Sequence, residues 1–209
     1  EQLIDALSSS AMQVRSLAAD QLSDRVGGAA IPSLRNAAQS SQSANTRIGT
    51  MWVLHRLGAL DDVLLVAAAQ DEAELVRTHS MRLLAEATHL SPQLKGIAID
   101  GLTDSAPLVR RAAADALSQH VDPDSIKPLL VALDSTPTAD VHLKHSIMIA
   151  LKSQLREPSA FATLAKANLT REQRLALARI ALAVPTAAAA EFLIAAMQDG
   201  LGNDEQLRP

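Results

Sequence analysis

Apolar side chains recur along this sequence at intervals of three and four residues, the spacing that places them on one face of an α-helix. The same pattern returns six times, at intervals of about 32 residues. Its anchor positions are Arg15, Arg47, Arg77, Arg110, His142 and Arg174. Seven residues after each anchor stand Leu22, Leu54, Leu84, Leu117, Ile149 and Ala181, which we expect to be buried.

Each repeat reads as two antiparallel helices joined by a short linker. We call the helix that carries the anchor the B helix, and its partner the A helix. B helices are predicted at about 12–26, 44–58, 73–88, 106–120, 138–155 and 170–184. A helices are predicted at about 2–9, 28–40, 60–70, 91–103, 122–135, 157–168 and 186–200.

Several predicted helix starts carry their own capping chemistry. Ser91-Pro92, Asp122-Pro123 and Thr136-Pro137 each place a capping oxygen before a proline at the first helical position. Thr170 with Gln173 has the spacing of a capping box. The glycosylation sequon that ends at Thr170 is therefore better explained as a helix cap.

Composition supports packed helices and narrows the range of functions. Hydrophobic residues make up 48% of the chain but aromatic residues only 1%, so the apolar content is mostly Ala and Leu. The net charge of −4, with no strongly basic half, argues against a nucleic-acid partner. Without cysteine there is no disulfide, thiolate zinc ligand or covalently attached c-type haem. No apolar run is long enough to predict membrane insertion.

The segment Asp104-x4-Val109-Arg110-Arg111-Ala112-Ala113-Ala114-Asp115-Ala116-Leu117 resembles the core of a HEAT repeat, and Asp71-x4-Val76-Arg77 is a second copy. The resemblance covers nearly the whole chain. It implies an all-α fold, a right-handed α-α superhelix of the HEAT or armadillo kind with about six two-helix repeats. It also implies a polar ladder between repeats, carried by Asp71, Arg77, Asp104 and Arg110. The motif is incomplete at His142, where the arginine is missing. It is also incomplete at Arg15, Arg47 and Arg174, which lack an aspartate six residues earlier.

Residues 50–60 (TMWVLHRLGAL) and 76–86 (VRTHSMRLLAE) resemble, more narrowly, the HEAT segment of large secreted bacterial proteins. Those proteins join a sorbosone-dehydrogenase-like propeller and a c-type cytochrome domain to HEAT repeats. The resemblance implies an exported or periplasmic protein in which residues 1–209 form a single solenoid domain, part of a longer chain. The alternative function is thus an accessory domain that positions the electron acceptor of a redox enzyme.

The sequence offers few groups for catalysis or metal binding. No phosphate-binding glycine loop, nucleophile motif or zinc-protease motif is present. His142 and His145 share a helix face near Asp140, and Glu86 lies close to His89, but no further ligands converge on either pair. His55 could approach His79 or Glu86 across one repeat spacing. We predict a chain that is not an enzyme and holds no cofactor or metal.

The B helices line the concave side of a HEAT solenoid, the usual binding surface. On this side we expect a protein-binding patch, because tryptophan and arginine are enriched at binding hot spots. Its candidate residues are Trp52, His55, Arg56, Arg82 and Glu86. The alternative is that Trp52 fills the core, where Gly49 leaves room.

The last two B helices are apolar on more than one face. Residues 142–155 and 174–184 carry Leu, Ile, Met and Val almost all round the helix. We expect the second face to be covered, either by the array itself or by another domain. The predicted function is a scaffold and interdomain spacer whose partners are proteins or neighbouring domains.

Overall fold

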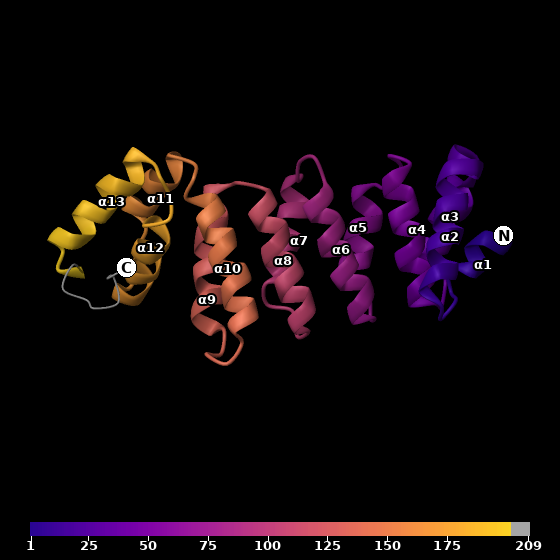
Figure 1. The fold of residues 1–209 in the computed structure, drawn as a ribbon, viewed down its shortest axis with the longest axis horizontal. Coiled ribbons are helices and arrows are strands. Elements are labelled where there is room, and N and C mark those ends of the chain that lie inside the picture. The colour runs from indigo at the N-terminus through magenta and orange to yellow at the C-terminus, as the bar shows by residue number, and fades with distance from the viewer. Residues whose placement is uncertain (202–209) are drawn as a thin grey trace. The chain divides into compact units, whose positions relative to one another are not determined.

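The computed structural model describes residues 1–201, and over this range the regular structure is helical (Figure 1). The α-helices are α1 (Gln2–Ala6), α2 (Met12–Gln21), α3 (Ile31–Ser40), α4 (Ala44–Arg56), α5 (Asp62–Ala69), α6 (Glu74–Glu86), α7 (Pro92–Gly101), α8 (Pro107–Gln119), α9 (Ile126–Ser135), α10 (Val141–Gln154), α11 (Ser159–Lys166), α12 (Arg171–Ala181) and α13 (Ala187–Gln198). The predicted all-α solenoid class is confirmed.

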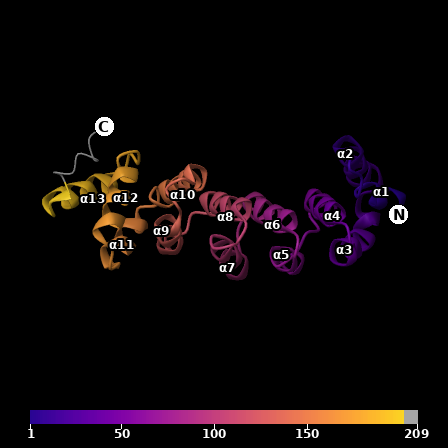
Figure 2. The same ribbon diagram turned by 90° about the horizontal axis from the view of Figure 1, so that it is seen from below.

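The chain divides into two compact units, with the division between Ile97 and Ala98 inside α7. In unit 1 the B helices α2, α4 and α6 form one layer, and the A helices α3 and α5 form the other (Figure 2). Unit 2 repeats the arrangement, with α8 and α10 in one layer and α9 and α11 in the other (Figure 2).

The core of unit 1 follows the predicted stripe. Leu22 of the first repeat and Leu54 of the second are buried together with Leu7 and Leu34. At the end of α2 the chain forms a short π-helical turn, Leu22–Val26, and then a 3-10 turn, Gly27–Ala30, before α3. Gly27 has φ of 61°, a left-handed conformation that favours glycine at this helix-to-helix turn.

The register predicted for the fifth repeat is wrong by two residues. The prediction placed the anchor at His142 and buried Ile149, but Ile149 is 45% exposed and Leu151 is fully buried. In the other B helices the anchor lies four residues after the N-cap. In α10 the N-cap is Asp140, so the anchor position belongs to Lys144. Val141-His142 resembles the Val-Arg pair of the other anchors, but the Asp140 cap places these two residues in the first turn of α10, before the anchor position.

Three of the four predicted capping sites act as helix N-caps. The Ser91 hydroxyl accepts from the Leu94 N–H, Asp122 caps a 3-10 turn (Pro123–Ser125) that leads into α9, and Thr170 with Gln173 forms the capping box. Thr136 behaves differently, because its hydroxyl donates to the Ala132 carbonyl and so closes α9. Asp140 caps α10 in its place.

Candidate protein-interaction surface

The B helices of unit 1 enclose a groove of about 410 Å³, which we call the Trp52 groove. Its wall residues include Met12 of α2, Ile48 and Trp52 of α4, and Leu75 and His79 of α6. Met12 and Leu75 are more than half exposed, so the groove presents apolar surface to solvent. It therefore combines a concave shape with apolar side chains whose burial by a partner would favour binding.

Gly49 explains why the floor of this groove is closed. A Cβ at Gly49 would lie 3.0 Å from Cδ2 of Leu7, which is buried against α4. The room that Gly49 leaves is thus taken by Leu7 of the preceding repeat. Trp52 stands one turn further along α4, half-buried on the wall of the groove.

Trp52 is held in place by a hydrogen bond to the next repeat. Its Nε1–H donates to Nδ1 of His79 at 2.9 Å. Nδ1 can accept only when it carries no proton, so the His79 proton resides on Nε2 and the imidazole is neutral. Burial, reinforced by the nearby Arg82 charge, lowers the pKa of His79 and favours this neutral form.

His55 lies against the same indole ring from the side of α4. The His55 and Trp52 ring centroids are 5.9 Å apart and the rings are nearly perpendicular. The His79 ring makes a similar edge contact at 6.1 Å. His55 and His79 were expected to approach each other across one repeat, and the structure brings both rings into contact with the indole of Trp52.

The three charged candidates of the predicted patch have different surroundings. Arg56 donates to Asp20 at 2.8 Å and to Asp24 at 3.1 Å, so its charge is engaged by the neighbouring repeat. Arg82 and Glu86 are exposed on α6, and neither forms an ion pair with any residue in the 1–201 range. Arg82 lies near the groove, close enough to His79 to affect its pKa.

Four of the anchor arginines have a common contact. Arg15, Arg47, Arg77 and Arg110 each donate from Nη1 to the backbone carbonyl six residues earlier, which closes the loop before the B helix, whereas Arg174 donates to the Asp199 carboxylate. The acceptors are Ser9 for Arg15 (2.7 Å), Ser41 for Arg47 (2.6 Å), Asp71 for Arg77 (2.9 Å) and Asp104 for Arg110 (2.7 Å). The Asp71 and Asp104 carboxylates accept from the N–H groups of Ala73 and Ala106 in the same loops.

Arg47 makes a further contact that the motif did not indicate. Its Nε and Nη2 both lie 2.8 Å from the two carboxylate oxygens of Asp71, which belongs to the following repeat. The pair is nearly buried, with side-chain exposures of 10% and 13%. The missing aspartate before Arg47 is therefore irrelevant, because the relevant carboxylate lies 24 residues later in the sequence. A ladder that runs through further repeats stays a prediction.

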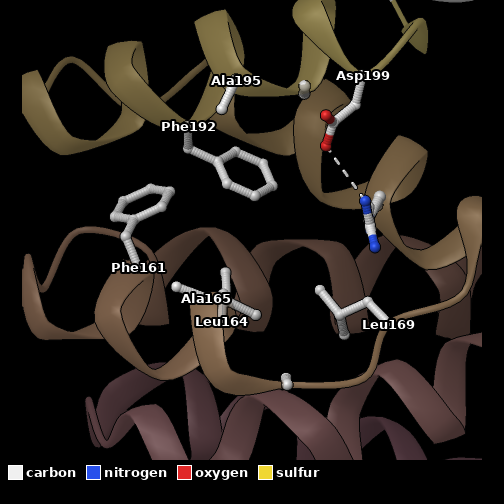
Figure 3. A pocket seen from close by; sticks show the side chains of 10 residues that line it. Phe161, Leu164, Ala165, Leu169, Phe192, Ala195 and Asp199 are labelled. Atoms are coloured by element: carbon white, nitrogen blue, oxygen red, sulfur yellow. Dashed lines mark hydrogen bonds and ion pairs between the residues drawn. The ribbon is translucent and has the colours of Figure 1, made fainter.

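A second hollow lies in unit 2 among α11, α12 and α13 (Figure 3). Its volume is about 270 Å³, and Phe161 and Phe192 face each other across it with ring centroids 5.5 Å apart. Arg174 donates to Asp199 at 3.3 Å along one edge. The lining is otherwise aliphatic, so the hollow offers contact area but few polar groups to orient a ligand.

The remaining candidate metal-binding residues do not lie close together in the part of the chain that the structure describes. Within residues 1–201, no three His, Cys, Asp or Glu side chains lie close enough together to hold a metal ion. His142 and His145 are exposed on α10, and the neighbouring Asp140 carboxylate is engaged as a helix cap. The hydrogen bond from the Leu143 N–H, aided by Arg111, lowers the pKa of Asp140. Among the helices that the structure describes, none combines the length and apolarity needed to cross a bilayer.

A family model of HEAT repeats matches residues 62–144, from α5 into α10 and less than half of the chain. A comparison with curated proteins finds no match. Neither result supports the narrower resemblance to propeller dehydrogenases with a cytochrome domain. HEAT repeats generally serve as protein-interaction scaffolds and are typically not catalytic. The chain is thus an all-α protein of HEAT-like helix pairs.

Proposed function

We propose that this chain is a non-catalytic protein-interaction scaffold and that the Trp52 groove is its principal binding site. The observation that carries this proposal is the fixed indole of Trp52, oriented by His79 and edged by His55 in a groove with exposed apolar walls. A rigid aromatic side chain loses little conformational entropy on binding, so its burial by a partner contributes strongly to the binding free energy.

The occupant that fits best is a peptide segment with one large apolar side chain and a nearby acidic residue. The apolar side chain would enter between Met12, Trp52 and Leu75. The acidic residue would meet Arg82, whose guanidinium has no ion-pair partner within residues 1–201. Arg15, which also lines the groove, already donates to the Ser9 and Ser10 carbonyls and is less able to change partner.

The partner can be a separate protein or another domain of a longer chain. In the second case the helix pairs act as a spacer that fixes the distance between domains. Both cases require the same surface and therefore predict the same effect of groove substitutions.

Selection of a random peptide library displayed on phage against the 209-residue chain tests this proposal. Selected peptides should share a large apolar residue with an acidic neighbour. Trp52→Ala and Leu75→Asp should each weaken binding by about tenfold or more, which corresponds to about 1.4 kcal/mol. The matched control is Val63→Asp, which changes an exposed apolar residue on the A helix α5 and should leave affinity unchanged.

Circular dichroism and thermal unfolding establish that each variant keeps its helices. If folded Trp52→Ala and Leu75→Asp proteins bind the selected peptides as tightly as the parent chain, the groove is not the binding site. Selected peptides without a shared apolar residue would contradict the proposed occupant.

A further inference from the structure

In unit 2, α10 and the C-terminal end of α12 leave large apolar side chains uncovered. Met148 is 42% exposed, whereas the residues at its repeat position in α4, α6, α8 and α12 are at most 2% exposed. Ile149 beside it is 45% exposed, and Leu182, the C-cap residue of α12, is 57% exposed. These three residues belong to adjacent B helices that pack on each other.

The same two helices carry an excess of positive charge. In α10 the charged side chains are Lys144 and Lys152, with no acidic residue, and α12 has three arginines against one glutamate. This contrasts with the net charge of −4 for the whole chain. Lys152 and Arg179 form no ion pair with any described residue, so both are available to an incoming anion.

Repeat positions place these charges beside the apolar residues. On α10, Ile149 and Lys152 are three residues apart, as are Arg179 and Leu182 at the end of α12, so each pair shares a helix side. Ile149 and Arg179 occupy the same repeat position, five residues after their anchors Lys144 and Arg174. We call the surface of Met148, Ile149, Lys152, Arg179 and Leu182 the basic-apolar face.

We propose that the basic-apolar face binds an acidic amphipathic helix of a partner protein. Its apolar residues are spaced along two adjacent helices, so an incoming helix can lay one apolar stripe against them. Glutamates or aspartates that flank that stripe would pair with Lys152 and Arg179. Complementary charge sets the choice of partner, while burial of Met148, Ile149 and Leu182 contributes most of the affinity. This surface lies in unit 2 and does not depend on the Trp52 groove.

The composition of the face favours a helix over other anionic partners. Nucleic acid is read through phosphate contacts and stacked bases, but the face has an aliphatic centre with no aromatic side chain. Lys152 and Arg179 are two cations, fewer than the clusters of about four to eight Lys or Arg that bind anionic membranes. An acidic amphipathic helix can cover the apolar centre with its apolar side chains and pair its carboxylates with Lys152 and Arg179.

The test uses the 209-residue chain and two labelled synthetic peptides of about 20 residues, long enough to form a helix on binding. Both peptides carry leucine at every third or fourth position, flanked by glutamate in one and by lysine in the other. Fluorescence anisotropy should show that the glutamate peptide binds about tenfold or more tightly than the lysine peptide. The double substitution Lys152→Glu with Arg179→Glu should reverse this preference.

Ile149→Ser should weaken binding of the glutamate peptide, whereas Val131→Ser, at an exposed position on the A helix α9, should not. Failure of both peptides to bind, equal affinity for the two, or an equal loss in Val131→Ser would overturn the proposal. So would tighter binding to phosphatidylserine vesicles or to duplex DNA than to the glutamate peptide. Self-association in sedimentation that the double substitution abolishes would show that a second copy is the occupant instead.

Discussion

At the scale of single residues, the hydrogen bond between Trp52 and His79 couples the candidate binding site to pH. The bond requires an unprotonated Nδ1, and protonation would convert that atom into a second donor facing the indole N–H. The orientation of the indole thus depends on the charge of a neighbouring side chain.

Stability should report this coupling. Because the pKa of His79 is lowered in the folded chain, the unfolded chain binds more protons below the ordinary value of 6.5. The free energy of unfolding should therefore fall as pH drops through and below about 6.5. His79→Gln, which keeps an acceptor for Trp52, should reduce that decline, as measured by urea unfolding at several pH values. His145→Gln, on exposed α10, is the control, and equal declines in the parent and His79→Gln proteins would contradict this account.

Which residues are buried was predicted better from the sequence than which residues contact one another. The buried stripe is correct at Leu54, Leu84 and Leu117, because helical periodicity is a local property. The Arg47–Asp71 pair was missed, since it joins two repeats and local spacing does not reveal it. The grouping of Met12 and Leu75 with Trp52 was missed for the same reason.

Loss of the Arg47–Asp71 pair should lower the free energy of unfolding more than loss of the Arg110 hydrogen bonds. Arg47→Ala leaves a nearly buried carboxylate without its partner, and we expect a loss of about 3 kcal/mol in the free energy of unfolding. Arg110→Ala removes hydrogen bonds to the Asp104 and Ser105 carbonyls and should cost roughly 1–3 kcal/mol. Chemical denaturation measures both. A change within error for Arg47→Ala would mean that the inter-repeat pair adds no net stability.

At the scale of elements, the end of α8 depends on one buried side chain from α10. The Gln154 side-chain amide donates to the Leu117 carbonyl at 2.7 Å and accepts from the Asp122 N–H at 2.6 Å. Gln154 is fully buried, so water cannot replace these bonds. A polar residue within an apolar helix gave no sign of this role in the sequence.

Gln154→Leu should destabilise the chain by roughly 2–3 kcal/mol, since it strands a carbonyl and an N–H inside the protein. Gln119→Leu, at an exposed position on α8, should change stability by no more than about 0.5 kcal/mol. Thermal and urea unfolding of both variants provide the comparison. Equal effects would show that the Gln154 hydrogen bonds are not what holds this junction.

At the scale of the whole molecule, stacking of neighbouring repeats should set stability, as in other solenoids. α10 packs extensively on α8, and a cut after Gln119 would expose the buried side of α10 that includes Ile147 and Leu151. The separate pieces should therefore unfold at lower temperatures than the intact chain in circular dichroism. Unchanged midpoints would contradict the expectation of a single domain over residues 1–209.

The most direct test of the central claim, that the B helices of unit 1 form the binding face, is hydrogen–deuterium exchange with and without a selected peptide. Exchange should become slower in α2, α4 and α6 around Met12, Trp52 and Leu75 and stay unchanged in α3 and α5. Protection centred on α3 and α5, with none in the B helices, would place the binding site on the opposite layer and contradict the account.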